Sequence, residues 1–291
     1  MTGALLSFSV SAVAIRALAK QLTTFEILSI RSGFGLAVLL LIVALRPEMR
    51  KDLALRRMGL HIARNGIHFV GTYTWTLAVT LLPFATVFAL EFTMPMWVAL
   101  LAVPLLGERM TVSRAGSIVL GFLGVLVIVR PGLSSFQPMA LLVLMAAFAF
   151  ALSLIATKML TSNVSTFAII FWMNLMQLPM GLAGSDPLFL TRLDWSLALP
   201  AFALGAVGLT SHYCLTNAFR AGDASVVVPL DFLRIPLIAM VGWLFYGEGL
   251  DAFVFAGAAL IIGGVLWNLR AESRRRPPTG LGPEKATAAD A

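Results

Sequence analysis

Long apolar runs separated by short turns dominate the pattern of this chain. Each run holds about 20 mostly apolar residues, which is the length an α-helix needs to cross a bilayer. The runs are too long and too evenly apolar for the alternating strands of a membrane β-barrel, and backbone amides in lipid must be satisfied within each segment. The pattern predicts an all-α integral membrane protein with ten transmembrane helices, at residues 2–20, 25–45, 59–81, 84–106, 112–130, 138–160, 165–185, 197–218, 224–246 and 251–269.

The composition agrees with a membrane protein and excludes several other classes. Apolar residues make up 59% of the 291 residues, charged residues make up 12%, and the mean hydropathy is +0.92. A soluble domain carries roughly 45–50% apolar and about 25% charged residues, so a soluble enzyme and a disordered chain are excluded. The single cysteine, Cys214, allows no intramolecular disulfide. The formal charge is +7, but the basic residues are spread between apolar runs, so no nucleic-acid partner is expected.

The basic residues of the turns predict the orientation. With the N-terminus in the cytoplasm, fourteen Lys and Arg fall on the cytoplasmic side and three on the other, which agrees with the positive-inside rule. Both termini are then cytoplasmic, and residues 270–291 form a disordered basic cytoplasmic tail. A cleaved signal peptide is the alternative for the first run, because Ala17-Leu18-Ala19 resembles a cleavage site, although no basic residue precedes the apolar stretch.

An internal repeat appears when the sequence is shifted by 140 residues. The first copy covers 1–131 and the second covers 138–269, with five runs each. An odd number of spans turns the second copy upside down, and inverted repeats are typical of secondary transporters. The aligned pairs are Gly107-Glu108 with Gly247-Glu248, Glu91 with Asp231, Phe92 with Phe232, Tyr73 with Tyr213, Thr76 with Thr216 and Gly124 with Gly264.

A Gly-Glu turn that leads into a Gly-rich last helix in each half resembles the drug/metabolite transporter superfamily, and within it the EamA-type ten-helix exporters. The bacterial aromatic amino acid exporters are similar in general appearance. The resemblance implies a transporter in the bacterial inner membrane that exports small amphipathic metabolites, most specifically amino acids, by alternating access; export of lipophilic cations or drugs is the alternative. The residues that carry the resemblance are Gly107-Glu108-Arg109, Gly121, Gly124, Gly247-Glu248, Gly257, Gly263, Gly264 and Arg31.

Polar residues in the third run share one helix face, because they follow one another at spacings of three or four. Such a face meets protein or water rather than lipid. It either forms hydrogen bonds between helices or lines a cavity, and we favour the cavity. The residues are His61, Asn65, His68, Thr72 and Thr76, and the eighth run repeats the pattern with Gly205, Gly208, His212 and Thr216.

Charged residues within spans are costly and mark partners or pathways. Arg31 and Glu91 lie at similar depths from the outer ends of their spans, so we predict that they pair. Asp231 has two candidate partners, Arg234 and Arg64. These pairs either hold helices together or let an acid bind a solute amine or carry a proton.

The candidate solute site lies between the third, fourth, eighth and ninth runs at mid-depth, because inverted-repeat transporters bind there. The fork of an arginine suits a carboxylate, and aromatic side chains supply an apolar wall. The candidate solute-binding residues are His68, Thr72, Tyr73, Trp97, His212, Tyr213, Thr216 and Arg234.

The sequence contains no motif for catalysis, nucleotide binding or metal binding. It contains no nucleotide-binding loop and no His-Glu-x-x-His spacing, so we expect no enzyme, no ATP-driven pump, no cofactor and no metal. The expected partners are a small-molecule solute and membrane lipids, with the chain acting as a monomer or a homodimer. A channel or a membrane scaffold is the alternative of another class.

Overall fold

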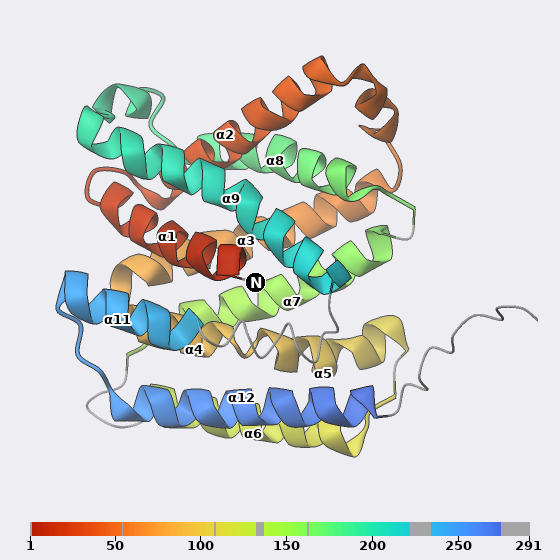
Figure 1. The fold of residues 1–291 in the computed structure, drawn as a ribbon, viewed down its shortest axis with the longest axis vertical. Helices are drawn as coiled ribbons and strands as arrows, with labels where there is room; N and C mark the ends of the chain where they lie inside the picture. The colour runs from red at the N-terminus through yellow and green to blue at the C-terminus, as the bar shows by residue number, and fades with distance from the viewer. Residues whose placement is uncertain are drawn as a thin grey trace, which may run out of the picture.

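The computed structural model describes residues 2–53, 55–107, 109–131, 137–161, 163–221 and 234–274, and the side chains of residues 2–5 and 212–221 are outside the description. Within these ranges the chain is helical and contains no strand (Figure 1). The helices are α1 (Thr2–Leu18), α2 (Thr24–Leu45), α3 (Met58–Leu81), α4 (Phe84–Glu91), α5 (Met94–Leu106), α6 (Val112–Val129), α7 (Ala140–Leu160), α8 (Thr166–Leu182), α9 (Trp195–Ala221), α11 (Arg234–Tyr246) and α12 (Ala252–Ser273), with short 3-10 turns at Pro47–Leu53 and Phe189–Arg192.

The apolar runs form the helices. Five segments are long and apolar enough to cross a membrane, and shorter apolar helices accompany them. The long segments are Thr24–Leu45, Phe84–Leu106, Val112–Val129, Ala140–Leu160 and Ala252–Ser273. α3 is as long as these, but the polar residues along one of its faces lower its hydropathy. The ninth predicted run, 224–246, is described only from Arg234 onward.

The fourth run, which the sequence predicts as one helix, is broken into α4 and α5 at Phe92 and Thr93. Pro95 stands at the second position of α5, and a proline ring clashes with the carbonyl four residues earlier, here that of Glu91. The Thr93 hydroxyl donates to the Leu90 carbonyl at 2.7 Å, so the break leaves this carbonyl satisfied. The interruption places Glu91 at a helix end inside the bundle.

α6 and α12 lie side by side along one edge of the bundle (Figure 1). They run antiparallel, because Arg130 at the end of α6 pairs with Asp251 just before α12, while Arg114 near the start of α6 pairs with Glu272 near the end of α12. The two backbones nearly touch: a Cβ on Gly257 would lie 2.5 Å from the carbonyl oxygen of Gly124. Glycine is required here by the close approach.

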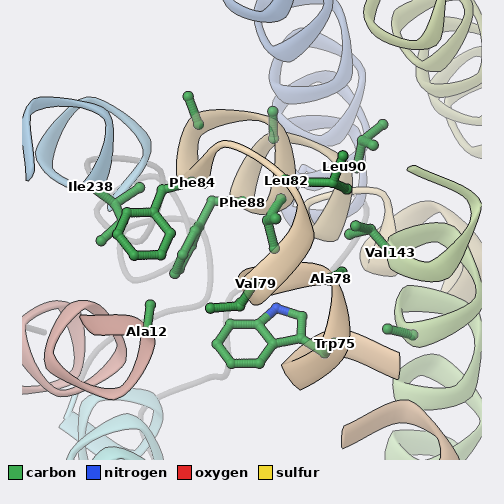
Figure 2. Packing of buried hydrophobic residues seen from close by; sticks show 14 of the residues in the cluster. Ala12, Trp75, Ala78, Val79, Leu82, Phe84, Phe88, Leu90, Val143 and Ile238 are labelled. Carbon is green, nitrogen blue, oxygen red and sulfur yellow. The ribbon is translucent and has the colours of Figure 1, made fainter. Parts of the chain in front are cut away.

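The remaining helices pack in pairs around a core centred on α4. α3 packs on α7, α1 on α9, α2 on α8 and α9, and α4 on α7 and α11. In the core, Phe88 lies beside Phe84 and Ile238, with the Trp75 indole below (Figure 2). Trp75 and Phe88 meet edge to face with ring centroids 5.9 Å apart, which is a favourable aromatic geometry.

We predict that Gly257→Ala destabilises the protein and Gly263→Ala does not. The new methyl group at 257 would collide with backbone, which costs about 1–3 kcal/mol, whereas a Cβ at 263 meets nothing within 4 Å. Replacing the helical glycine 263 by alanine should instead stabilise α12 by up to about 1 kcal/mol. Thermal unfolding of the two variants in detergent tests this, and equal melting temperatures would contradict the close packing of α6 on α12.

Candidate functional site

Six polar side chains of α3 form a buried column, called here the α3 polar column. Five of them follow one another at spacings of three or four residues, and the sixth, Arg64, directly precedes Asn65, so the six share one face. That face packs on α7 and α8. Between the first and the last, fifteen residues of helix span about 22 Å. The members are His61, Arg64, Asn65, His68, Thr72 and Thr76, and all are buried.

The middle of the column is held by hydrogen bonds to neighbouring helices. The amide nitrogen of Gln177 on α8 lies 2.8 Å from Nδ1 of His68, and Asn65 donates to the Trp172 carbonyl at 3.3 Å. Arg64 donates from Nε to the Thr157 hydroxyl on α7 at 3.1 Å. Hydrogen bonding between helices, one of the two roles expected for this face, is therefore present in this structure.

At its C-terminal end the column meets the α4–α5 break. Trp75, three residues beyond Thr72, donates from Nε1 to Oε2 of Glu91 at 2.8 Å. The other oxygen, Oε1, accepts from Nη2 of Arg234 at 3.2 Å. Glu91 therefore joins α3, α4 and α11 at the point where the fourth apolar run is interrupted.

This geometry corrects the predicted pairing of Arg31 with Glu91. The partner of Glu91 is Arg234, and Arg31 makes no ion pair with a carboxylate in the described ranges. Arg31 lies instead against α9, where its Nε would be 3.3 Å from a Cβ on Gly208. The reason is lateral position: α2 packs on α8 and α9, whereas α4 packs on α7 and α11.

Aromatic rings surround the guanidinium of Arg234, whose residue is only 3% exposed. Its Cζ lies 4.5 Å from the ring centroid of Phe8 and 5.0 Å from those of Phe88 and Phe92. Ring faces attract cations, most strongly where water is excluded. Three phenylalanines from α1, α4 and the break thus form a cage around the ion pair.

The other candidate residues are only partly brought together. The rings of Tyr73 and Phe25 contact each other in a tilted arrangement, with centroids 4.7 Å apart. The ring centroids of Trp97 and Phe148 on α7 lie 5.3 Å apart, and those of His68 and Phe150, also on α7, lie 5.6 Å apart. Residues two apart point to nearly opposite sides of a helix. α7 therefore separates Trp97 from His68. His212, Tyr213 and Thr216 are on α9, but their side chains, like Asp231, lie outside the described residues.

The sequence reasoning missed several polar groups that the structure brings into contact with the column. Gln177, which contacts His68, is buried on α8, and so is Asn174, which lies against Gly35 of α2. A buried amide in an apolar span is itself a signal. In the part of the chain that is described, no group of three His, Cys, Asp or Glu side chains could hold a metal ion.

A further cluster, called here the Arg16 clamp, was also missed. Arg16 pairs with Glu248 and donates from Nε to the Val79 carbonyl at 2.8 Å. Glu248 also accepts from the first amide of α4, that of Phe84, at 2.8 Å. The clamp ties α1, α3 and α4 to the turn between α11 and α12, at the end that the charge distribution places outside. Two more ion pairs across the halves lie at the same end, Arg192 with Glu26 and Arg130 with Asp251.

Comparison with known proteins places this fold in a family. The EamA-like transporter family matches the chain over residues 1–130 and again over 137–270. The S-adenosylmethionine uptake transporter of Rickettsia felis is 28% identical, covering 93% of this chain and 91% of that protein. The riboflavin transporter of Rhizobium johnstonii is 32% identical, covering 76% of each. The pseudopaline exporter of Pseudomonas aeruginosa is 28% identical, covering 88% and 89%. A solved crystal structure shares the fold with a TM-score of 0.61 at 19% identity, covering 95% of this chain and 97% of that one.

We predict that Glu91 and Arg234 are energetically coupled and that Glu91 and Arg31 are not. Glu91→Gln leaves the buried Arg234 without this counter-charge and should lower the stability in detergent by about 1–3 kcal/mol. Adding Arg234→Gln should recover part of the loss, whereas adding Arg31→Gln should give losses that simply add. Melting temperatures of the single and double variants measure both cycles. Additive losses for Glu91 and Arg234 would contradict the pair.

Proposed function

This chain belongs to the EamA-like transporter family, and we propose that it carries small amphipathic metabolites with a carboxylate, most specifically amino acids, out of the cytoplasm. Membership in the family makes the chain a membrane transporter of small molecules and not an enzyme. The named relatives include uptake transporters and an exporter with different solutes. The choice of solute and direction therefore depends on the chain's own residues.

The observation that carries the proposal is the caged Glu91–Arg234 pair at the helix break. Discontinuous helices build the solute sites of many secondary transporters. An amino acid offers the same two charges as the pair: its carboxylate can replace Glu91 on the fork of Arg234, and its ammonium can replace Arg234 on Glu91. Because each buried charge keeps a partner, the exchange avoids leaving an ion uncompensated.

The walls of the proposed site come from the α3 polar column and from α9. His68, Thr72 and Tyr73 contribute from α3, and His212, Tyr213 and Thr216 occupy the corresponding stretch of α9. Trp97 is left out of the proposed site, since α7 separates it from His68. Glu91, and Asp231 as its repeat equivalent, are the groups that would exchange a proton if transport is coupled to one.

We propose that the site is exposed alternately by two inverted five-helix repeats, 1–131 and 138–269. The same family matches both halves, and α5 and α11 end at Leu106 and Tyr246, which are 140 residues apart. Gly107 and Gly247, which follow them, both have positive φ, at 68° and 65°. The equivalent helices α6 and α12 run antiparallel, as an inverted repeat requires.

Export of lipophilic cations or drugs is the second candidate, favoured by the aromatic cage. Phe8, Phe88 and Phe92 could hold an organic cation in place of the Arg234 guanidinium, with Glu91 as counter-charge. A channel or a scaffold differs from both, because neither shows saturable exchange.

We predict that Arg234→Gln lowers phenylalanine counterflow in liposomes by at least about 10-fold, since a charged hydrogen bond to the carboxylate is lost. Phenethylamine, which lacks the carboxylate, should be a poor solute for the unaltered protein.

His68→Ala should change solute preference or apparent affinity, while Trp195→Phe, at a residue that is 93% exposed, serves as the control. Counterflow of phenethylamine but not phenylalanine would favour the cation exporter, and absence of saturable exchange for all twenty amino acids would overturn the proposal.

We also propose the bacterial inner membrane as the location, with both termini in the cytoplasm, and predict the matching reporter pattern. A reporter fused after Ala271 should be active as a cytoplasmic fusion, and one inserted in the turn at 186–194 as an external fusion. The reverse pattern would contradict the orientation derived from the basic residues of the turns.

A further inference from the structure

Arg64 is a buried cation without a counter-charge in the described ranges. Its residue is 6% exposed, and the only hydrogen bonds it makes there run from Nε to the Thr157 hydroxyl at 3.1 Å and from Nη1 to the side-chain oxygen of Asn65 at 2.7 Å. No described carboxylate forms an ion pair with Arg64, and neither of these two hydrogen bonds uses its Nη2. A buried charge that is only partly compensated is costly, so this side chain is suited to receive an anion.

Two further polar groups beside Arg64 are buried without partners. His61 precedes Arg64 by one turn of α3, is 0% exposed, and has no hydrogen-bond partner for either ring nitrogen among the described residues. The indole Nε1 of Trp172 on α8 is likewise buried and unpaired within them. The two rings lie with centroids 6.5 Å apart. Such atoms are rare in native proteins and point to a ligand or an ordered water.

The three groups have one chemistry in common. A guanidinium nitrogen and an indole N–H can only donate, and a neutral imidazole donates from one of its nitrogens. Donors from α3 and α8, beside a positive charge that no described carboxylate pairs with, select an acceptor that is negatively charged. The fork of an arginine fits a carboxylate in particular.

We propose that His61, Arg64 and Trp172 form a second solute-binding subsite, which takes a carboxylate. It lies about 16 Å along α3 from Trp75 and Glu91, in the half of the bundle that the charge distribution places toward the cytoplasm. Its role rests on the proposed transport of carboxylate-bearing solutes: a solute from the cytoplasm is first held here and then passes along the α3 polar column to Arg234. Binding at the subsite, however, is measured without transport.

The test uses the full chain purified in detergent, with Glu91→Gln and Arg234→Gln combined as background so that the central pair is neutral. The probe is 3-phenylpropionate, with the uncharged 3-phenylpropanamide as its analogue, and the readout is the dose-dependent rise in melting temperature. The carboxylate should stabilise this background protein saturably and the amide should not. Adding Arg64→Gln should raise the apparent Kd at least about 10-fold, and His61→Phe or Trp172→Phe about 3- to 10-fold each.

Control variants keep the outcomes distinct. Trp243→Phe, at a tryptophan that is 55% exposed, should leave the apparent Kd unchanged. If Arg64→Gln does not fold, His61→Phe and Trp172→Phe still test the subsite, since each keeps a ring in place. If the unaltered protein shows no amino acid transport in liposomes while the probe still binds in the Arg64-dependent way, the proposed function fails and the subsite stands.

Two results would overturn the subsite. Stabilisation by chloride or inorganic phosphate that depends on Arg64, with none by 3-phenylpropionate, would identify an inorganic anion as the occupant instead of a carboxylate. Absence of any anion effect that depends on Arg64 would show that the three groups face only ordered water.

Discussion

A charge inside a bilayer has to keep a partner, and this constraint determines how the helices are arranged. α3 carries its polar residues on one face, so α7 and α8, which supply Thr157, the Trp172 carbonyl and Gln177, pack against that face. An apolar helix could rotate against its neighbours at little cost, whereas α3 could not without leaving buried polar atoms unpaired. On the proposed function, a polar solute would follow this same face of α3.

The break between α4 and α5 adds a second requirement to the first. A helix C-terminus carries partial negative charge on its unpaired carbonyls, and the end of α4 coincides with the carboxylate of Glu91. Both features attract a cation, and Arg234 of α11 supplies it. Trp75 holds the other carboxylate oxygen, so the carboxylate is fixed between an indole and a guanidinium. A small shift of α11 relative to α4 therefore acts directly on this ion pair.

The ends of the apolar helices were predictable because lipid fixes the length of an apolar helix. Which helix packs beside which was not predictable from the sequence. Depth in the membrane made Arg31 and Glu91 look like partners, but depth is one coordinate only, and the side on which α2 packs puts Arg31 against Gly208. Trp97 failed to join His68 for the same reason, since Phe148 and Phe150 place them on opposite sides of α7. The helix break did have a signal in Pro95, outweighed by the unbroken apolar run. That the equivalent polar side chains of α9 line the same site stays a prediction.

The ion pairs of the chain fall into two kinds, and the difference bears on how a transport cycle could be driven. Arg16 and Glu248 have side chains that are 13% and 12% exposed at the end of the bundle, so water reaches the clamp and can replace its partners if the halves part there. In the Arg234–Glu91 pair the side chain of Glu91 is 15% exposed, but that of Arg234 is 4% exposed within a phenylalanine cage. Separating the pair without a substitute would leave a buried guanidinium, which costs several kcal/mol. A solute with both charges supplies the substitute. On the proposed alternating access, solute binding would therefore release the pair whose cation is shielded from water, and the Arg16–Glu248 pair would follow at lower cost.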